Sequence, residues 1–420
     1  MRIVVVSLPT DPYAKLGTAD TGGMNLLVRQ QAQGLAALGH EVEIWTRRSD
    51  PDQPAESEPF LGVILRRLPA GPPEPVGRAE ALRWVDEFTD AMRTQYPADL
   101  VHAHSWLSGL AALPVARIWD VPLVVSFHVL AAANAGAALS LGEPPESSRR
   151  GPAERLLAHR ARVVVALSRA EADLVTQRLG VPPAQVRVVR PGVDSALFHP
   201  VEPRHPGAPG APRLLADRYL LWAGRIDPAK GADLAVAALA AIPPQRRPNL
   251  VLLGSVPPEY EDYADTLAAT ISGLQLRDRV IRLGPQSKEA FARLMREAAL
   301  LLVPSWTDTS GLAALEAAAS GVPVVGSRVG GLVETVLDRV TGVLIGSRDR
   351  DVWAGEIDRL LTDEVLRWQL GQQARAHALG YTWRHCAEAL NRVYAEACHT
   401  EATAPATPTD YPEDRSDAAG

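Results

Sequence analysis

The chain has 420 residues, of which 46% are hydrophobic, and a formal net charge of −6 at pH 7. This length exceeds the size at which one hydrophobic core keeps growing, so two domains of roughly 200 residues each are expected. The last twenty residues hold five acids and one arginine, a charge of −4, which leaves −2 for the rest. A body so close to neutral lacks the basic stripe of nucleic-acid-binding proteins, and that class is excluded.

Cysteine usage and apolar runs indicate the compartment. Two cysteines, Cys386 and Cys398, cannot build a disulfide framework and are typical of a reducing compartment. Each has a histidine neighbour, but on one helix the pairs would lie about 18 Å apart, too far to share a metal. The apolar start over 3–6 meets Pro9 too soon for a signal peptide, and no run reaches the length of a membrane span. We therefore expect a cytoplasmic protein.

In the first half of the chain, short apolar segments alternate with helical ones, which is the pattern of a parallel sheet covered on both faces. The clearest helix is predicted over 24–38 and ends at Gly39, where a C-terminal glycine is expected. Strands are predicted at 3–7, 41–46, 63–68, 100–103, 123–127, 163–166 and 186–189. These elements form a first α/β domain over 1–199.

A second α/β series follows a segment rich in proline and glycine, which predicts a linker over 200–212. The second domain is predicted over 213–382, with strands at 219–223, 250–253, 280–283, 300–303, 322–325 and 342–345. Two doubly wound domains bind ligands in a cleft at the carboxyl ends of both sheets. A last helix is predicted over 383–398, and the acidic tail over 400–420 is expected to be disordered because it holds little apolar surface.

Two cations emerge at the carboxyl end of the first strand of the second domain. Arg225 and Lys230 lie in the segment 224–231, and Lys230 is one of only three lysines in the chain. Arginine supplies planar bidentate donors and lysine a compact point charge, as a diphosphate leaving group requires. The pair therefore predicts a diphosphate site, although two ordinary solvated charges are the alternative.

The segment 304–331 carries two carboxylates, Asp308 and Glu316, on either side of Gly311, which opens an alanine-rich helix. A carboxylate before a helix, amides at its first turn and a second carboxylate one turn later form a cup for hydroxyls and an anion. A nucleotide sugar is such a ligand.

Two further features face the predicted cleft. Gly22 and Gly23 precede the first helix, where a backbone without side chains can approach a phosphate. His128 ends a predicted strand and can hydrogen-bond a sugar hydroxyl or steady charge near a reacting carbon. A plain turn and a structural histidine are the respective alternatives, and the pair at 102 and 104 is interpreted as structural.

Two short acidic patterns, Asp50-Pro51-Asp52 and Asp349-Arg350-Asp351, match the acid-x-acid motif that chelates a metal-bound nucleotide in other transferases. Because arginine and lysine already serve the diphosphate, no metal is required. We expect metal-independent chemistry with no cofactor besides the nucleotide-sugar substrate.

Together these features resemble the family 4 retaining glycosyltransferases, which have the GT-B fold of two facing Rossmann-like domains. The segments that carry the resemblance are Gly22-Gly23, His128, residues 190–194, Gly224-Arg225, Lys230-Gly231, residues 304–316 and Gly330-Gly331. Their order and spacing match the family over nearly the whole chain. The resemblance implies an α/β GT-B fold whose last helix crosses back to the first domain.

The same resemblance implies roles for individual residues. Arg225 and Lys230 would hold the donor diphosphate, Glu316 the ribose hydroxyls, and Asp308 the donor sugar. The implied catalytic residues are His128, Arg225, Lys230 and Asp308. The implied donor-binding residues are Gly23, Arg225, Lys230, Asp308, Ser310, Gly311, Leu312 and Glu316. Retention in such enzymes is explained by front-side attack, so the protein contributes positioning and electrostatic stabilisation rather than a nucleophile.

Within the family, three segments are similar to the actinobacterial enzymes that attach N-acetylglucosamine to inositol phosphate in mycothiol synthesis, namely 21–25, 69–72 and 102–109. Those enzymes hold the acceptor phosphate with a lysine, a tyrosine, a threonine and an arginine. Arg78 stands for the lysine and Arg149 or Arg150 for the arginine, whereas Ser105 and Val129 replace the tyrosine and the threonine. The implied acceptor-binding residues are Asn25, Arg78, Ser105, Val129 and Arg150.

The donor side departs from the family as well, because Asp308-Thr309-Ser310 stands where glutamate followed by Pro-Phe is usual. The altered sugar and acceptor residues predict transfer to a small polar acceptor in a specialised-metabolite pathway such as antibiotic assembly. The mycothiol-pathway inositol-phosphate N-acetylglucosaminyltransferase is the alternative. A GT-B-fold epimerase and an inactive nucleotide-sugar-binding protein are less favoured alternatives. Arg225 and Lys230 argue against the inactive protein, which has no leaving group to stabilise. The sequence leaves the identity of the nucleotide base open, with Arg282 as a candidate neighbour of the base. It also leaves open whether the protein forms a homodimer.

Overall fold

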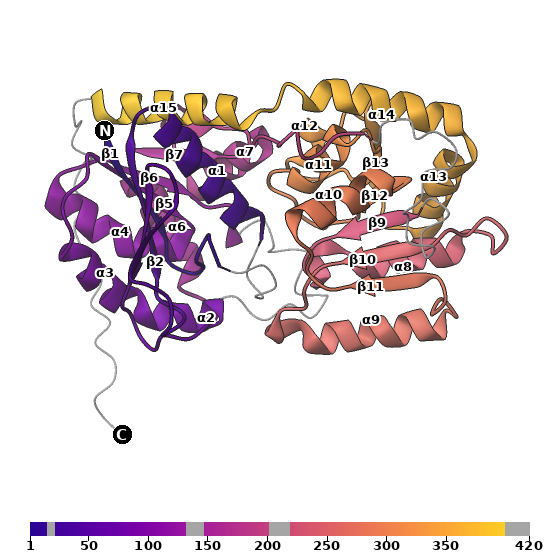
Figure 1. Ribbon diagram of the computed structural model, residues 1–420, viewed down its shortest axis with the longest axis horizontal. Coiled ribbons are helices and arrows are strands. Elements are labelled where there is room, and N and C mark those ends of the chain that lie inside the picture. The colour runs from indigo at the N-terminus through magenta and orange to yellow at the C-terminus, as the bar shows by residue number, and fades with distance from the viewer. Residues whose placement is uncertain (15–21, 132–146, 201–218, 400–420) are drawn as a thin grey trace.

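The computed structural model describes residues 1–14, 22–131, 147–200 and 219–399, without the side chains of Arg78 and Ala79. Two α/β lobes lie side by side, each built around one sheet (Figure 1). Nearly all of the predicted linker over 200–212, and the predicted tail over 400–420, fall outside the described residues.

The first lobe holds an eight-stranded sheet of order β3-β4-β2-β1-β5-β6-β7-β8. Its strands are β1 (Arg2–Ser7), β2 (Glu41–Arg47), β3 (Glu56–Phe60), β4 (Val63–Leu68), β5 (Leu100–His104), β6 (Leu123–Ser126), β7 (Val163–Ala166) and β8 (Val186–Val188). Only β3 runs antiparallel to its neighbour among these strands. The sequence patterns do not predict β3, because its residues are polar and largely exposed and include Pro59, which an edge strand tolerates.

The second lobe holds a six-stranded parallel sheet of order β11-β10-β9-β12-β13-β14. Its strands are β9 (Leu220–Ala223), β10 (Leu250–Leu253), β11 (Val280–Leu283), β12 (Leu300–Val303), β13 (Val324–Ser327) and β14 (Gly342–Ile345). β13 begins two residues after the predicted start at 322, directly behind Pro323, which has no N–H to give to the ladder. Most strands are apolar runs buried on both faces, as parallel sheets require.

Helices cover both faces of each sheet (Figure 1). Those of the first lobe are α1 (Gly23–Ala37), α2 (Arg78–Ala81), α3 (Val85–Arg93), α4 (Trp106–Trp119), α6 (Arg150–Arg160) and α7 (Arg169–Leu179). Those of the second are α8 (Ala232–Ala241), α9 (Glu261–Gly273), α10 (Lys288–Glu297), α11 (Leu312–Ala319), α12 (Leu332–Thr335), α13 (Arg350–Thr362) and α14 (Glu364–Ala378). Short 3₁₀ helices occur at Leu82–Trp84, Pro183–Gln185, Pro228–Lys230 and Pro258–Tyr260.

The last described helix, α15 (Trp383–His399), leaves the second lobe and lies along the first (Figure 1). Cys386, Leu390 and Tyr394 are buried in the same core cluster as the apolar face of α1. The two helices approach closely at Gly34, where an added Cβ would lie 2.5 Å from the Cβ of Ala387. Burial of this apolar face stabilises the packing of α15 against the first lobe.

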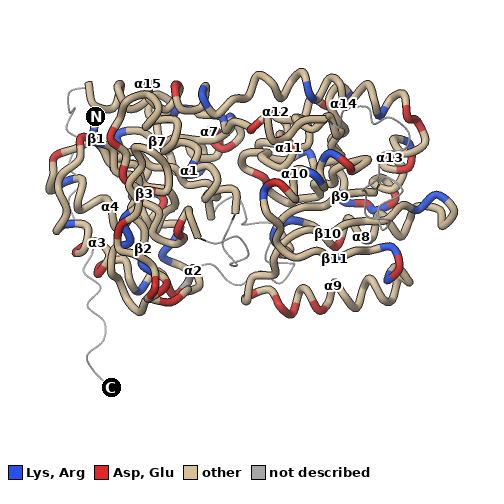
Figure 2. The backbone as a smooth tube through the Cα atoms, in the orientation of Figure 1, with Lys and Arg blue, Asp and Glu red and all other residues tan. Residues whose placement is uncertain are grey.

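Charges are interspersed over both lobes, without an extended stripe of one sign (Figure 2). Both cysteines are free thiols, Cys386 buried and Cys398 exposed. Across the described ranges, no three histidine, cysteine or acidic residues are grouped to hold a metal ion. Within the same ranges, no helix is long and apolar enough to cross a membrane.

Candidate active site

The loop after β9 is built around the buried carboxylate of Asp227. Its Oδ2 lies 3.0 Å from Arg225 Nη2, and its Oδ1 accepts the backbone N–H of Lys230 at 3.0 Å. Asp227 thereby caps the 3₁₀ helix Pro228–Lys230 and fixes both predicted diphosphate cations at one end of the sheet. Gly231 follows at φ +69°, where an added Cβ would lie 2.1 Å from the carbonyl oxygen of Pro304. Only glycine lets the two loops pack this closely.

Asp308 links this loop to the start of α11. Its Oδ2 lies 3.6 Å from Lys230 Nζ, and its Oδ1 accepts the backbone N–H of Gly311 at 2.7 Å and that of Ser310 at 3.3 Å. The carboxylate therefore fixes the turn that leads into α11 and faces a cation at the same time. The amides of Ser310 and Gly311 were expected to bind the donor, but in this structure they donate to Asp308.

Glu316 lies one turn into α11 and is buried. Burial raises the pKa of this carboxyl to about 7, and the Lys288 ammonium opposes the shift. Lys288 is the first residue of α10, and its ammonium stands over the ring of Phe198 at 5.9 Å from the centroid. Partial burial lowers the pKa of Lys288. Sequence reasoning missed Lys288, although the scarcity of lysine singled it out.

His128 follows β6 with φ +66°, a left-handed conformation that is uncommon outside glycine. Both lobes contact the backbone of His128. From the second lobe, Thr309 Oγ1 donates a hydrogen bond to the His128 carbonyl oxygen. The Glu171 carboxylate accepts the backbone N–H groups of His128 and of Leu167. Its imidazole Nε2 lies 2.9 Å from Nδ1 of His104. The predicted catalytic histidine is thus fixed at the interface of the lobes.

The N-termini of α1 and α11 meet across this interface. An added Cβ on Gly23, the first residue of α1, would lie 3.2 Å from Cδ1 of Leu312, the first residue of α11. Two helix N-termini, each preceded by glycine and without a side-chain cap, therefore bring backbone dipoles of the same sign together, which favours an anion between them.

Further contacts join the lobes near the end of β8. The Glu334 carboxylate, on α12, accepts both Nε and Nη2 of Arg190 and the backbone N–H of Arg169. Arg169 is the first residue of α7, so Glu334 also occupies a helix N-terminus of the first lobe. These bonds fix the relative position of α7 and α12 and hence of the two sheets.

The predicted acceptor-binding residues are spread over several elements of the first lobe. Asn25 is buried, its side-chain Oδ1 accepts from Thr10 Oγ1 at 2.6 Å, and its Nδ2 donates to the carbonyl of Asp11. Ser105 follows β5 with its Oγ 3.3 Å from Ser108 Oγ. Both residues support loops at the carboxyl end of the first sheet.

Arg150 contacts Val129 through the backbone carbonyl of Val129. The Arg150 guanidinium donates to the Val129 carbonyl and pairs with the Glu154 carboxylate at 2.7 Å. The Val129 side chain is exposed. The side chain of Arg78, the fifth predicted acceptor residue, lies outside the description.

A cavity of about 330 Å³ lies at the carboxyl ends of β9, β10 and β11. It is lined by Ile226, Gly254, Ser255, Val256, Arg282, Leu283, Gly284 and Pro285. Gly254 has φ +152°, and an added Cβ would lie 1.7 Å from the carbonyl oxygen of Gly224. Arg282, the candidate neighbour of the base, thus borders a cavity beside the diphosphate loop.

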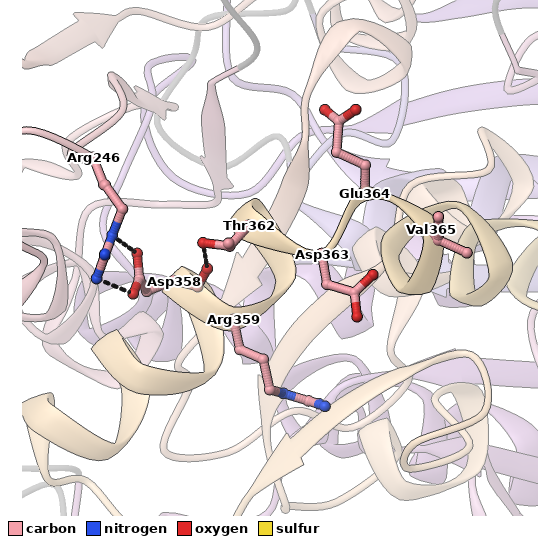
Figure 3. A pocket seen from close by; sticks show the side chains of 7 residues that line it. All are labelled: Arg246, Asp358, Arg359, Thr362, Asp363, Glu364 and Val365. Atoms are coloured by element: carbon pink, nitrogen blue, oxygen red, sulfur yellow. Dashed lines mark hydrogen bonds and ion pairs between the residues drawn. The ribbon is translucent and has the colours of Figure 1, made fainter.

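A larger hollow of about 620 Å³ lies where α13 meets α14 (Figure 3). Its wall includes a bidentate pair between Arg246 and Asp358, at 2.9 and 2.7 Å. In Figure 1 this junction lies at the end of the second lobe away from the first. The hollow therefore has no share in the interface of the lobes.

Comparison with known proteins agrees with this geometry. Residues 22–192 match the family model "Glycosyl transferase 4-like domain", and residues 212–377 match "Glycosyl transferases group 1". A D-inositol 3-phosphate glycosyltransferase of Saccharomonospora viridis is 37% identical, with 94% of each chain covered. One of Salinispora arenicola is 36% identical over 94% of this chain and 92% of the relative.

Solved structures share the whole architecture. Sucrose-phosphate synthase from Thermosynechococcus elongatus is 28% identical with a TM-score of 0.84, covering 94% of this chain and 98% of its own. Anabaena Alr3699/HepE in complex with UDP and glucose is 20% identical with a TM-score of 0.74, covering 94% of this chain and all of its own.

The fold and site thus define a glycosyltransferase with the GT-B architecture, and this prediction is confirmed. The chain belongs to the family 4 glycosyltransferases and is related to the D-inositol 3-phosphate glycosyltransferases.

Proposed function

We propose that this enzyme transfers a sugar from a nucleotide-diphosphate sugar to a phosphorylated inositol, without a metal ion and with retention at the anomeric carbon. The observation that carries the proposal is the position of Lys230, whose Nζ lies 3.6 Å from Asp308 at the N-terminus of α11. A diphosphate bound there would meet Lys230, Arg225 and a helix dipole of favourable sign. Such preorganised charge stabilises a departing diphosphate.

Residues at the same edge of the second sheet would make the remaining contacts to the donor. Glu316, with its carboxyl buried one turn into α11, would accept the ribose hydroxyls. The cavity bordered by Arg282 and Gly254 would hold the base. The sugar would then extend toward Asp308 and His128 at the interface of the lobes. This placement would hold the reacting groups in one geometry.

Retention follows from a front-side attack. The acceptor hydroxyl would attack the anomeric carbon from the face that the diphosphate leaves, and a phosphate oxygen would take its proton. No protein nucleophile enters this step. His128, Arg225 and Lys230 would position the sugar and stabilise the charge that develops on the leaving group.

The relatives support inositol phosphate as the acceptor more than they support the predicted antibiotic pathway. Those named above, at 36% and 37% identity, are both D-inositol 3-phosphate glycosyltransferases and align over nearly their whole length. A second acceptor class is favoured by one observation. Ser105 and Val129 replace two hydrogen-bonding groups, and the Arg150 guanidinium binds Glu154 and the Val129 carbonyl. A specialised-metabolite acceptor without phosphate is the corresponding second candidate.

Nucleotide binding is the first experiment. A ligand that binds only the native state raises its unfolding free energy, by about 2.7 kcal/mol at a hundred times its Kd. Thermal unfolding with UDP, GDP, ADP and dTDP should show one clear shift, and Lys230→Ala should reduce it. UDP is tried first because the Anabaena protein of the same fold is solved with UDP.

Turnover is the second experiment. The sugar nucleotide of the base that binds is incubated with D-inositol 3-phosphate and, separately, with unphosphorylated inositol and amino-sugar acceptors. We expect release of the nucleoside diphosphate to require the phosphorylated inositol. Faster release with an acceptor without phosphate would favour the second candidate. An unchanged sugar nucleotide with every acceptor would contradict both.

A further inference from the structure

Two histidines of adjacent strands meet ring to ring beneath the interface of the lobes. His104 ends β5 and His128 follows β6, and His104 Nδ1 lies 2.9 Å from His128 Nε2. Their ring planes differ by 18° and their centroids are 5.1 Å apart. Centroids this far apart in nearly parallel rings fit an in-plane hydrogen bond, because stacked faces would lie closer. One nitrogen therefore donates and the other accepts.

The surroundings of His104 decide which nitrogen donates. His104 is buried, and burial lowers its pKa well below the usual value, so its imidazole is neutral and carries one N–H. Its Nε2 is also buried and has no hydrogen-bond partner among the described residues. A proton on Nε2 would leave a donor orphaned in the interior, which native structures rarely tolerate. A proton on Nδ1 is bonded to His128 instead.

We infer that His104 is a positioning residue, whose Nδ1–H donates to His128 Nε2 and thereby fixes His128 as the tautomer protonated on Nδ1. His128 then presents an N–H donor, and not a lone pair, on its second nitrogen. A second proton on His128 would place two N–H groups head to head at 2.9 Å, so the same contact disfavours the imidazolium.

The ring of His104 packs against the ring of His102. Their ring centroids are 4.2 Å apart, and both nitrogens of His102 are bonded, to Tyr394 Oη at 2.7 Å and to Ser126 Oγ at 2.9 Å. Tyr394 belongs to α15. The anchored ring of His102 packs against the ring of His104 and takes no part in the hydrogen bond between His104 and His128.

The functional consequence rests on the proposed function. A neutral Nδ1–H on His128 can donate a hydrogen bond to a hydroxyl of the donor sugar without placing a positive charge beside the electron-poor anomeric carbon. A donor on this nitrogen selects for an oxygen acceptor on the sugar.

The test compares two substitutions at one position. His104→Asn keeps an N–H at nearly the place of Nδ1, whereas His104→Leu keeps the volume and removes the donor. His102→Leu is the matched packing control, because it removes a buried histidine of the same strand without touching the bond to His128. Imidazole ¹⁵N NMR of protein labelled on histidine reports the tautomer directly, with His128→Gln assigning the signals.

We expect wild type and His104→Asn to show His128 protonated on Nδ1, and His102→Leu to leave that tautomer in place. His104→Leu should show a mixture of tautomers and a kcat lower by about three- to tenfold, the size of one net hydrogen bond, with KM for the sugar nucleotide little changed. His128 protonated on Nε2 in the wild type, or an unchanged tautomer in His104→Leu, would overturn the inference.

The NMR readout is independent of turnover, so the two proposals can fail separately. A protein with the expected tautomer that transfers no sugar would contradict the proposed function and support the role of His104. A protein that transfers sugar with the opposite tautomer would do the reverse.

Discussion

Lys230 Nζ lies 3.6 Å from Asp308 Oδ2, while the other oxygen of that carboxylate accepts the N–H of Gly311. The carboxylate thus separates a cation from a helix N-terminus, two groups that attract the same anion. Both side chains are partly accessible, Lys230 at 34% and Asp308 at 13%. A donor diphosphate can therefore take over the lysine without unfolding the loop.

Lys230→Ala should lower kcat about 100-fold or more, because it removes preorganised charge from the leaving group. Its ion pair is partly exposed, so the free energy of unfolding should fall by less than about 1 kcal/mol. Steady-state kinetics and urea unfolding of the same preparation measure both. Lys230→Arg, which keeps the charge but not its shape, should retain part of the activity. Turnover of the alanine variant at the wild-type rate would remove Lys230 from the site.

Asp308→Ala should lower the free energy of unfolding by about 1 kcal/mol, because it removes the acceptor of the Gly311 and Ser310 amides in the turn before α11. Asp308→Asn keeps a side-chain oxygen for the Gly311 amide and should leave stability nearly unchanged. Both variants should lose activity if the carboxylate contacts the sugar. Urea unfolding and initial rates separate the two roles, and full activity of Asp308→Asn would limit the carboxylate to holding this turn.

Glu316→Gln should change how stability depends on pH. Burial raises the pKa of Glu316 from 4.5 to about 7, so the native state holds this proton over a range where the unfolded chain has lost it. The contribution of Glu316 to stability is therefore greatest below pH 4.5 and falls as pH rises toward 7. Glutamine does not titrate. As pH rises from 4.5 to 7, the free energy of unfolding of the variant should therefore increase relative to that of the wild type, by on the order of 3 kcal/mol.

Urea unfolding of both proteins at several pH values across this window measures the difference. Glu171 has the same sign of shift for the same reason, and it is unchanged in both proteins, so its effect cancels. A constant difference between wild type and variant would show that the Glu316 carboxyl titrates at its ordinary pKa.

Tyr394→Phe should cost about 1 kcal/mol of unfolding free energy, because the hydroxyl lies 2.7 Å from Nδ1 of the buried His102 and its loss leaves that nitrogen unpaired. Tyr381→Phe is a matched control, since its hydroxyl donates to the Glu334 carbonyl at 3.2 Å from a half-buried position. We expect a smaller loss there. Equal losses in the two variants would argue against a special role for the bond between α15 and β5.

Most of the fold could be predicted from sequence, because buried parallel strands are local apolar runs and Gly39 ends the first helix locally. β3 could not, since an exposed edge strand with proline has no such pattern. The turn at Asp308 was within reach, because aspartate side chains commonly accept backbone N–H groups two or three residues further along the chain.

Contacts between distant segments were beyond the sequence patterns. His104 and His128 meet because β5 and β6 are neighbours, and the order of strands in a sheet is a tertiary property. The bond of Arg150 to the Val129 carbonyl and that of Thr10 to Asn25 likewise depend on how loops fold over the sheet edge. The predicted donor residues came together better than the acceptor residues, because most lie on the loops after β9 and β12, two neighbouring strands of one sheet.

The most direct test of the proposed function is product analysis by NMR, with D-inositol 3-phosphate and a sugar nucleotide of the base that binds as substrates and Lys230→Ala as the control. We expect release of the nucleoside diphosphate together with one new anomeric signal of the same configuration as the donor, absent in the variant. A product of inverted configuration, or equal release of the nucleoside diphosphate by the Lys230→Ala variant, would contradict the proposed function.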